Sequence, residues 1–490
     1  MLLQPLFTHA REHPQDIAII DDTGQYTFEQ LAGMTAGLGM YIASQTSRPH
    51  VGLLLPPCAG YVASFYGTLL AGKSVVPINY LLGDREIAYV IKDSEISTVI
   101  TIPPLAARLK DAAMKLIDLT QLPKTPPAIA PKLPPAKTDE LAVLMYTSGT
   151  SGNPKGVMLT YENLQSDANS CIAAAQLQSK HTFLGAIPLF HAFGMTATMV
   201  CPIQLGSKII YQSRFSPLGM LQAVRKHNIS IIFGVPSMFG AMLRLDSIAP
   251  EDFKQVYALI SGGEPLPPLL RMGYERRLGT TIYEGYGLTE TSPVIALNTP
   301  QAHHPGSVGR PIPGVEVRIV GDDGKALPAE QSGEVWLRGP MIMKGYYKMP
   351  EQTAEVLTAD GFFKTGDLGK VDGDGFLHIT GRVKDLIIVA GEKVAPREIE
   401  DVLCRHPAVA EAAAVGRKDP SRGEAVVAFV VLQPNANIPA EELRNFCRDQ
   451  GLVGFKIPRQ VIFVSDLPRS PTGKVLKRTL AERANQAQPT

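Results

Sequence analysis

Residues 146–157 read Tyr-Thr-Ser-Gly-Thr-Ser-Gly-Asn-Pro-Lys-Gly-Val, which concentrates hydroxyls, glycines and one lysine in a short stretch. Apolar runs of strand length flank it, so we expect its polar part to be a loop between two strands. Glycines let the backbone approach an anion, while the hydroxyls and the lysine add donors and a positive charge. The stretch therefore suits phosphate, although ordinary surface turns have the same composition. The residues concerned are Thr147, Ser148, Gly149, Thr150, Ser151, Gly152 and Lys155.

A second stretch, residues 283–291, reads Tyr-Glu-Gly-Tyr-Gly-Leu-Thr-Glu-Thr. Tyr286 stands between Gly285 and Gly287, where its ring can lie flat against a purine. Thr289 can donate to a phosphate, and the Glu290 carboxylate is a hard oxygen ligand suited to Mg²⁺. Each residue is common by itself, so the prediction depends on the whole string.

Four shorter strings are ambiguous when taken alone. A glycine pair usually marks a tight turn, an aspartate after glycine is often a turn residue, and a lysine near the C-terminus is usually solvated. The carboxylate of the aspartate nevertheless offers the two acceptors that a diol needs. The strings are Gly262-Gly263-Glu264, Thr365-Gly366-Asp367, Gly381-Arg382-Val383-Lys384-Asp385 and Pro471-Thr472-Gly473-Lys474.

In this order the strings resemble the signature motifs of the adenylate-forming (AMP-binding) superfamily, which includes acyl-CoA synthetases, peptide-synthetase adenylation domains and beetle luciferases. The resemblance covers nearly the whole chain and favours the acyl-CoA synthetase, or fatty-acid-CoA ligase, branch. It implies that a carboxylate attacks the α-phosphorus of ATP, releasing pyrophosphate, and that the acyl adenylate is then transferred to coenzyme A. The cofactors implied are ATP, Mg²⁺ and coenzyme A.

The resemblance also implies a role for each matching residue. It gives catalytic roles to Lys155, Thr289, Glu290 and Lys474, metal binding to Glu290 with Thr147, and the hinge between two domains to Lys384. The substrate pocket would include His191, Phe193, Gly262, Gly263 and Gly285. The nucleotide site would comprise Thr147, Ser148, Gly149, Thr150, Ser151, Gly152, Lys155, Gly263, Glu264, Gly285, Tyr286, Gly287, Thr289, Asp367, Arg382 and Lys474.

The acyl group is predicted from what the pocket segment lacks. Residues 190–194 contain no acidic side chain to pair an α-amino group, which argues against an amino-acid substrate. Residues 193–200 carry no charge, which favours a fatty or aryl acid. Luciferases and plant coumarate ligases have lysines after the hinge where this chain has Ile388 and Ala390, so no lysine can be assigned to the second half-reaction.

Composition indicates the general class of the protein and its cellular compartment. A net charge of +1 and a hydrophobic fraction of 45% in 490 residues predict a globular protein with no bias toward nucleic acid. Five widely spaced cysteines and the absence of an export signal favour the cytoplasm. A carrier protein as the acyl acceptor, peripheral membrane contact and the oligomeric state are questions that the sequence leaves open.

Alternating strand and helix patterns from residue 25 predict an α/β fold with parallel sheets, including a helix that Thr27 and Gln30 cap. Residues 103–139 are rich in proline and are expected to be an extended linker. Residues 309–379 predict a β-rich subdomain. We therefore expect a large N-terminal adenylate-forming domain of parallel α/β subdomains plus the β-rich one, residues 1–383, and a small mobile α+β lid domain, residues 384–490.

Overall fold

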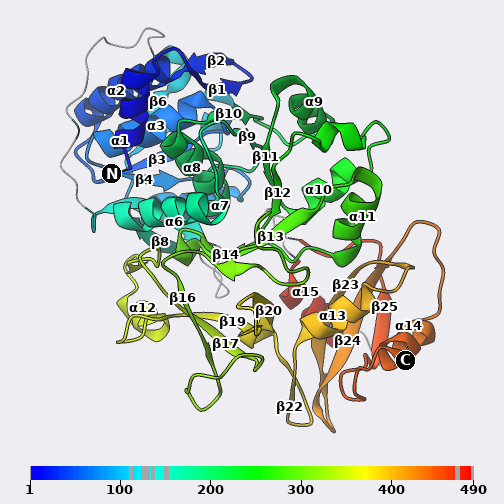
Figure 1. The fold of residues 1–490 in the computed structure, drawn as a ribbon. Helices are drawn as coiled ribbons and strands as arrows, with labels where there is room; N and C mark the ends of the chain where they lie inside the picture. The colour runs from blue at the N-terminus through cyan, green and yellow to red at the C-terminus, as the bar shows by residue number, and fades with distance from the viewer. Residues whose placement is uncertain are drawn as a thin grey trace.

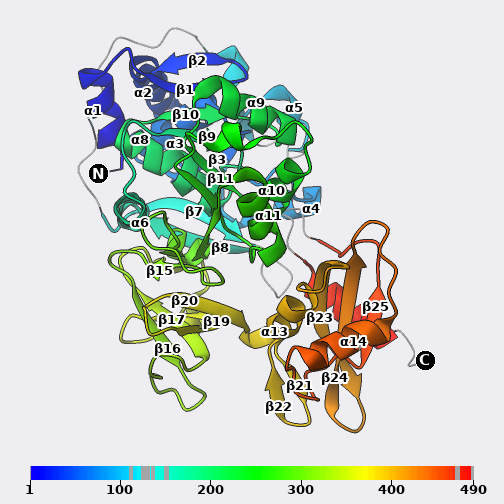
Figure 2. The ribbon, with the colours of Figure 1, turned by 45° about the vertical axis from the view of Figure 1, so that its right-hand side comes forward.

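The computed structural model describes residues 2–109, 114–122, 133, 138–147, 154–469 and 475–486. A large N-terminal domain holds three sheets, and a smaller C-terminal domain, orange to red in Figure 1, lies beside the four-stranded sheet and below α11. The same arrangement is seen after a rotation in Figure 2. The predicted α/β class is confirmed.

The first sheet has seven strands in the order β18-β8-β7-β4-β3-β5-β6. Its five strands from β7 to β6 run parallel, while β8 and β18 are antiparallel additions at one edge. The inner strands β3 and β4 are buried throughout because both faces are covered. Their bounds are β3 (His50–Leu54), β4 (Ser74–Pro77), β5 (Thr98–Thr101), β6 (Lys115–Asp118), β7 (Leu141–Thr147), β8 (Lys155–Thr160) and β18 (Gly345–Tyr346).

The second sheet has nine strands in the order β15-β14-β13-β12-β11-β9-β10-β1-β2. The strands from β13 to β1 are parallel, so their carboxyl ends meet at one edge. The bounds are β1 (Ile17–Asp21), β2 (Gly24–Thr27), β9 (Thr182–Gly185), β10 (Lys208–Tyr211), β11 (Ile231–Gly234), β12 (Ala258–Ser261), β13 (Ile282–Gly287), β14 (Val294–Leu297) and β15 (Arg310–Pro311).

Helices cover both sheets, and one of them contains a wide turn. Thr27 and Gln30 form the predicted capping box of α2. Between α7 and α8, residues Thr196–Val200 form a fully buried π-helical turn. The helices are α1 (Gln4–Glu12), α2 (Phe28–Gln45), α3 (Ala59–Leu70), α4 (Asp84–Asp93), α5 (Pro103–Ala106), α6 (Tyr161–Ala174), α7 (Ala192–Met195), α8 (Cys201–Leu205), α9 (Pro217–His227), α10 (Pro236–Leu243), α11 (Pro268–Leu278) and α12 (Pro350–Val356). Short 3₁₀ turns occupy Leu119–Gln121, Pro250–Phe253, Thr289–Thr291 and Val383–Asp385.

The third sheet of the N-terminal domain is the predicted β-rich region. Its four antiparallel strands follow the order β16-β17-β19-β20. The last strand ends at Arg382, directly before the 3₁₀ turn that contains Lys384. The bounds are β16 (Glu316–Val320), β17 (Gly333–Arg338), β19 (Phe363–Val371) and β20 (Leu377–Arg382).

In its described residues, the C-terminal domain consists of a five-stranded sheet with three helices. Among the described residues, the last buried member of the main N-terminal cluster is Leu377. The two C-terminal clusters begin at Ile387 and Ala413. The elements are β21 (Ile387–Val389), β22 (Glu392–Val394), α13 (Pro396–Leu403), β23 (Val409–Asp419), β24 (Gly423–Leu432), α14 (Ala440–Asp449), β25 (Gln460–Phe463) and α15 (Lys477–Gln486).

The expectation of an extended linker over residues 103–139 is wrong for its first part. Pro103 and Pro104 begin α5, where the first helical turn needs no proline N–H. β6 then pairs in parallel with β5 and completes the seven-stranded sheet. The prolines that suggested the linker lie outside the described residues, at positions 123, 126, 127, 131, 134 and 135.

Residues 185–206, the most apolar long stretch of the chain, lie mostly in the core. Their π-helical turn packs against α6 and β9. In the part of the chain that the structure describes, no helix has both the length and the apolar composition needed to cross a bilayer.

Candidate active site

A cavity of about 1070 Å³ lies at the carboxyl ends of β9, β11, β12 and β13. Ligands of α/β proteins bind at this edge because the loops that leave the parallel strands converge there. All but one of the described residues in the predicted site line the cavity. They are Thr147, Lys155, His191, Phe193, Gly262, Gly263, Glu264, Gly285, Tyr286, Gly287, Thr289, Glu290, Arg382 and Lys384.

Asp367 is the exception, because it lies buried just behind the cavity wall. Its Oδ2 accepts a hydrogen bond of 2.6 Å from the Tyr286 hydroxyl. Its Oδ1 lies 2.6 Å from Arg382 Nε in an ion pair. Burial and the adjacent carboxylate raise the pKa of Tyr286, so the phenol stays protonated and donates. This carboxylate therefore joins β13 to both β19 and β20.

Glu290 and Lys155 are connected through a residue that no motif indicated. The Tyr346 hydroxyl donates to Glu290 Oε1 at 2.9 Å, and Lys155 Nζ lies 4.9 Å from the centre of the Tyr346 ring. β18 places Tyr346 there because it pairs with β8, opposite Val157. Burial, followed by the Glu290 carboxylate, raises the pKa of Tyr346. The tyrosine holds an acid and a base at the same wall of the cavity.

The predicted phosphate loop joins two antiparallel strands, as expected. β7 ends at Thr147 and β8 begins at Lys155, and these two residues face each other across the ladder. Tyr146 fixes the end of β7, since its hydroxyl donates to Asp93 Oδ2 at 2.6 Å. The other residues of this loop prediction, Ser148, Gly149, Thr150, Ser151 and Gly152, lie outside the described residues.

Two glycines of the motifs are required by the backbone. A Cβ on Gly287 would lie 1.8 Å from the carbonyl oxygen of Pro293, so any side chain would displace the strand. Gly263 has φ of +84°, a conformation that disfavours other residues. Both glycines lie on the cavity wall, so at these two positions the backbone itself faces the cavity.

One end of the cavity is apolar. Phe193 packs edge-on against Phe233 with ring centres 5.8 Å apart, and its ring would be 3.3 Å from a Cβ on Gly262. His191 begins α7, where its Nδ1 accepts from the Phe193 N–H at 3.2 Å. The wall includes Cys171, Ala175, Leu177, Ile187, Phe190, Ala197, Cys201, Phe233, Val235, Met238, Ile260 and Leu297.

The C-terminal domain contributes to the same cavity. Arg469 and Leu476 line it, and these flank the undescribed segment 470–474 that contains Lys474. Arg469 also forms an ion pair with Glu411 of β23. Sequence reasoning did not single out Arg469, since an arginine before Ser-Pro has no motif of its own.

Glu284 is a third residue that the sequence did not reveal, although it belongs to the Tyr-Glu-Gly-Tyr string. It is buried in β13, and its Oε1 accepts from the Leu266 N–H at 3.2 Å. Burial raises the pKa of Glu284 to about 7, and the positive charge of Arg397 in α13 opposes part of the rise. The Glu284 carboxyl of the large domain, close to Arg397 of the small domain, therefore gains or loses its proton near neutral pH.

Comparison with known proteins agrees with this geometry. Residues 6–347 match the family model of the AMP-binding enzyme, and residues 398–474 match that of the AMP-binding enzyme C-terminal domain. The chain therefore belongs to the AMP-binding enzyme family. Within the family it falls in the acyl-CoA synthetase branch, and its predicted class, an AMP-forming acid–thiol ligase, is confirmed.

Relatives in this branch are similar over most of their length. The long-chain-fatty-acid–CoA ligase of Bacillus subtilis is 34% identical, with 89% of this chain and 86% of that protein covered. The sulfoacetate–CoA ligase of Cupriavidus necator is 36% identical, with 94% and 92% covered. The solved o-succinylbenzoate CoA synthetase of Bacillus subtilis, in complex with its acyl-adenylate intermediate, is 30% identical with a TM-score of 0.85, and 97% of each chain is covered.

We predict that Glu284→Gln changes how stability depends on pH. Between pH 4.5 and about 7 the unfolded carboxyl is ionised while the folded one keeps its proton, so rising pH destabilises the wild-type fold across this window. The shift corresponds to roughly 3 kcal/mol. The glutamine variant lacks this loss, so its melting temperature relative to that of the wild type should rise from pH 5 to about 7 and level off above it.

The measurement is calorimetric melting of both proteins at several pH values. Glu351→Gln, a change at an exposed glutamate, serves as the control and should follow the wild type. A constant difference between Glu284→Gln and the wild type at every pH would contradict the raised pKa of Glu284.

Proposed function

We propose that this ligase activates an apolar carboxylic acid, fatty or aryl, as an acyl adenylate and transfers the acyl group to coenzyme A. The observation that supports it is one continuous cavity with hydroxyl and charged groups at one end and apolar side chains at the other. ATP fits the polar end, the acid's hydrocarbon part fits the apolar end, and the two substrates meet between them.

Adenylate formation brings a carboxylate to the α-phosphate, so the site must offset the repulsion between two anions. Lys155 and Arg382 supply positive charge at the polar end, and Thr147 and Thr289 supply hydroxyls there. Glu290 and Thr147 are hard oxygen donors on the cavity wall, so they fit Mg²⁺. When bound, the ion would neutralise phosphate oxygens.

The nucleoside is assigned to the other motif residues of the polar end. Tyr286 would lie against the adenine, beside Gly263 and Glu264. Asp367 would accept from the ribose hydroxyls, since each of its oxygens keeps a second lone pair beyond the contacts with Tyr286 and Arg382. Arg382, which lines the cavity, would contact the ribose or a phosphate.

Lys474 is assigned to the transition state of adenylation. Its neighbours Arg469 and Leu476 line the cavity, which supports the assignment of this segment to the site. The domain boundary is proposed at 383/384, with Lys384 as the pivot, because the buried clusters separate between Leu377 and Ile387. Rotation about that pivot would replace the lysine by the thiol of coenzyme A.

Free coenzyme A is preferred here to a carrier protein because all three compared relatives are named for coenzyme A. The five free cysteines suit the reducing cytoplasm. The experiment that tests the function is ATP–pyrophosphate exchange with a panel of acids, followed by thioester formation with coenzyme A or a purified carrier. Turnover of polar short acids alone, or transfer only to the carrier, would contradict the proposal.

We predict that Ala197→Phe shortens the accepted acid. Ala197 lies on the apolar wall in the π-helical turn, so a larger side chain there reduces the space for a chain or ring. The kcat/KM for long acids should fall by at least roughly tenfold. Short acids are the internal control and should keep their rates, and an equal loss for every acid would indicate misfolding rather than a shorter pocket.

We predict that Lys474→Ala slows adenylate formation by on the order of 10² to 10³, the effect of removing one transition-state charge partner. Thioester formation from supplied acyl adenylate should survive. Lys477→Ala is the control, because Lys477 pairs with Glu400 at 2.7 Å within the small domain. Rapid-quench measurement of each half-reaction gives the answer, and equal losses in both would refute the role of Lys474.

We predict that Lys384→Pro separates the two half-reactions. Proline fixes φ at about −65° and so restricts backbone rotation at the proposed pivot. With the domains held as in this structure, pyrophosphate exchange should persist and thioester formation should largely disappear. Lys384→Ala keeps the backbone free and should perform both. Wild-type rates in both steps for the proline variant would move the pivot to another residue.

A further inference from the structure

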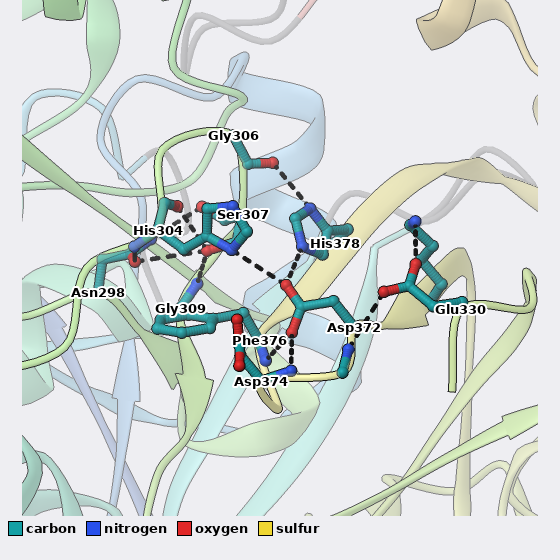
Figure 3. A network of polar contacts seen from close by, with 12 residues as sticks. Asn298, His304, Gly306, Ser307, Gly309, Glu330, Asp372, Asp374, Phe376 and His378 are labelled. Atoms are coloured by element: carbon teal, nitrogen blue, oxygen red, sulfur yellow. Dashed lines mark hydrogen bonds and ion pairs between the residues drawn. The ribbon is translucent and has the colours of Figure 1, made fainter. Parts of the chain in front are cut away.

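Three residues outside the lining of the cavity bring their polar side-chain atoms close together. His304 lies in the connection between β14 and β15, Asp372 follows β19, and His378 belongs to β20. Their ligand atoms all lie within 4.8 Å of one another. None of the three lines the cavity described above. Figure 3 shows both imidazole rings directed at the same carboxylate.

The carboxylate at the centre is held in a fixed orientation. Asp372 Oδ1 accepts from the N–H groups of Asp374 at 3.0 Å and Phe376 at 2.8 Å (Figure 3). Its Oδ2 therefore faces the rings, 3.0 Å from His304 Nδ1 and 2.8 Å from His378 Nε2. The supporting contacts from the backbone resemble the outer contacts that orient metal-binding carboxylates.

His378 has an acceptor opposite each ring nitrogen. Its Nδ1 lies 3.3 Å from the carbonyl oxygen of Gly306, and its Nε2 faces Asp372 Oδ2. A neutral imidazole has one N–H, so one nitrogen would present a lone pair to an oxygen. A second proton or a metal ion on Nε2 removes this repulsion. Donation of the other ring N–H to a backbone carbonyl is the usual arrangement of a metal-binding histidine.

The separations favour a small ion. Ligand atoms at about 2.0 Å from a tetrahedral ion are roughly 3.3 Å apart. Side-chain shifts of about a few tenths of an ångström would therefore separate these atoms enough to admit the ion. Two imidazole nitrogens with one carboxylate oxygen suit zinc-like ions rather than Mg²⁺. The His304 side chain is 45% exposed, which leaves an approach from solvent.

We propose that His304, Asp372 and His378 bind a divalent transition-metal ion of the zinc type, with water completing the coordination. The bound ion would link the β14–β15 connection to the β19–β20 hairpin. Backbone bonds already join the two segments, from Val308 N to Leu377 O at 2.8 Å and from Leu377 N to Gly309 O at 2.9 Å. The site thus lies on a preformed junction between the nine-stranded and four-stranded sheets.

The test is equilibrium dialysis of the untagged, chelator-treated full chain against Zn²⁺ with excess Mg²⁺ present. The wild type should bind one more equivalent of Zn²⁺ than Asp372→Asn, which keeps an oxygen for the backbone N–H groups. His378→Gln and the milder surface variant His304→Ala should lose at least tenfold in affinity. His303→Gln is the matched control, because this neighbouring ring packs on Tyr283 and lies outside the cluster.

Comparison between variants separates this ion from any bound by the five free cysteines, which every variant retains. Co²⁺ provides a second probe, because its visible absorption reports imidazole coordination in the wild type and His303→Gln only. Zn²⁺ should also raise the melting temperature of these two proteins and not of the other variants. Equal binding by the wild type and Asp372→Asn would overturn the proposal and leave the three residues as a hydrogen-bonded ion pair.

Discussion

The buried Asp367 carboxylate is the interaction on which the geometry of the polar end depends. Its partners, Tyr286 and Arg382, come from the nine-stranded sheet and from the last strand of the four-stranded sheet. An anion in this position would be costly if either partner were removed, because the remaining charge would stay buried. The contacts that the Asp367 carboxylate makes with Tyr286 and Arg382 therefore hold the two sheets in alignment. Tyr286 and Arg382 both line the cavity.

A single side chain also connects two others at the cavity wall, since Tyr346 contacts both Glu290 and Lys155. The tyrosine comes from a two-residue strand and reaches both the carboxylate and the ammonium group. A buried hydroxyl that donates to a carboxylate also limits how far that carboxylate can turn. The acid, on the 3₁₀ turn Thr289–Thr291, and the base, at the start of β8, are thus linked at one wall of the cavity.

Residue type at fixed spacing was enough to pick out most of the described residues that line the cavity of the candidate site. Thr147, Lys155 and Tyr286 fall where their strings placed them, because each string spans one strand end and the loop beside it. Tyr346 could not be found in this way, since its contact with Glu290 joins residues 56 positions apart. The raised pKa of Glu284 likewise depends on burial beside α13. β6 escaped prediction because proline-rich flanks masked a short, half-exposed strand.

The π-helical turn at Thr196–Val200 gives the apolar wall an unusual means of change. A π-turn holds one residue more than an α-turn, and such turns arise where a single residue is added to a regular helix. Because the wide turn takes up that residue locally, its loss would restore the α-helix and leave the flanking turns, including Cys201, facing largely as they do now. A single deletion could therefore remove one residue of the apolar wall, such as Ala197, and leave the helical segments on either side in place. The space at the apolar end can thus change by the volume of one whole residue without a rearrangement of the sheets around it.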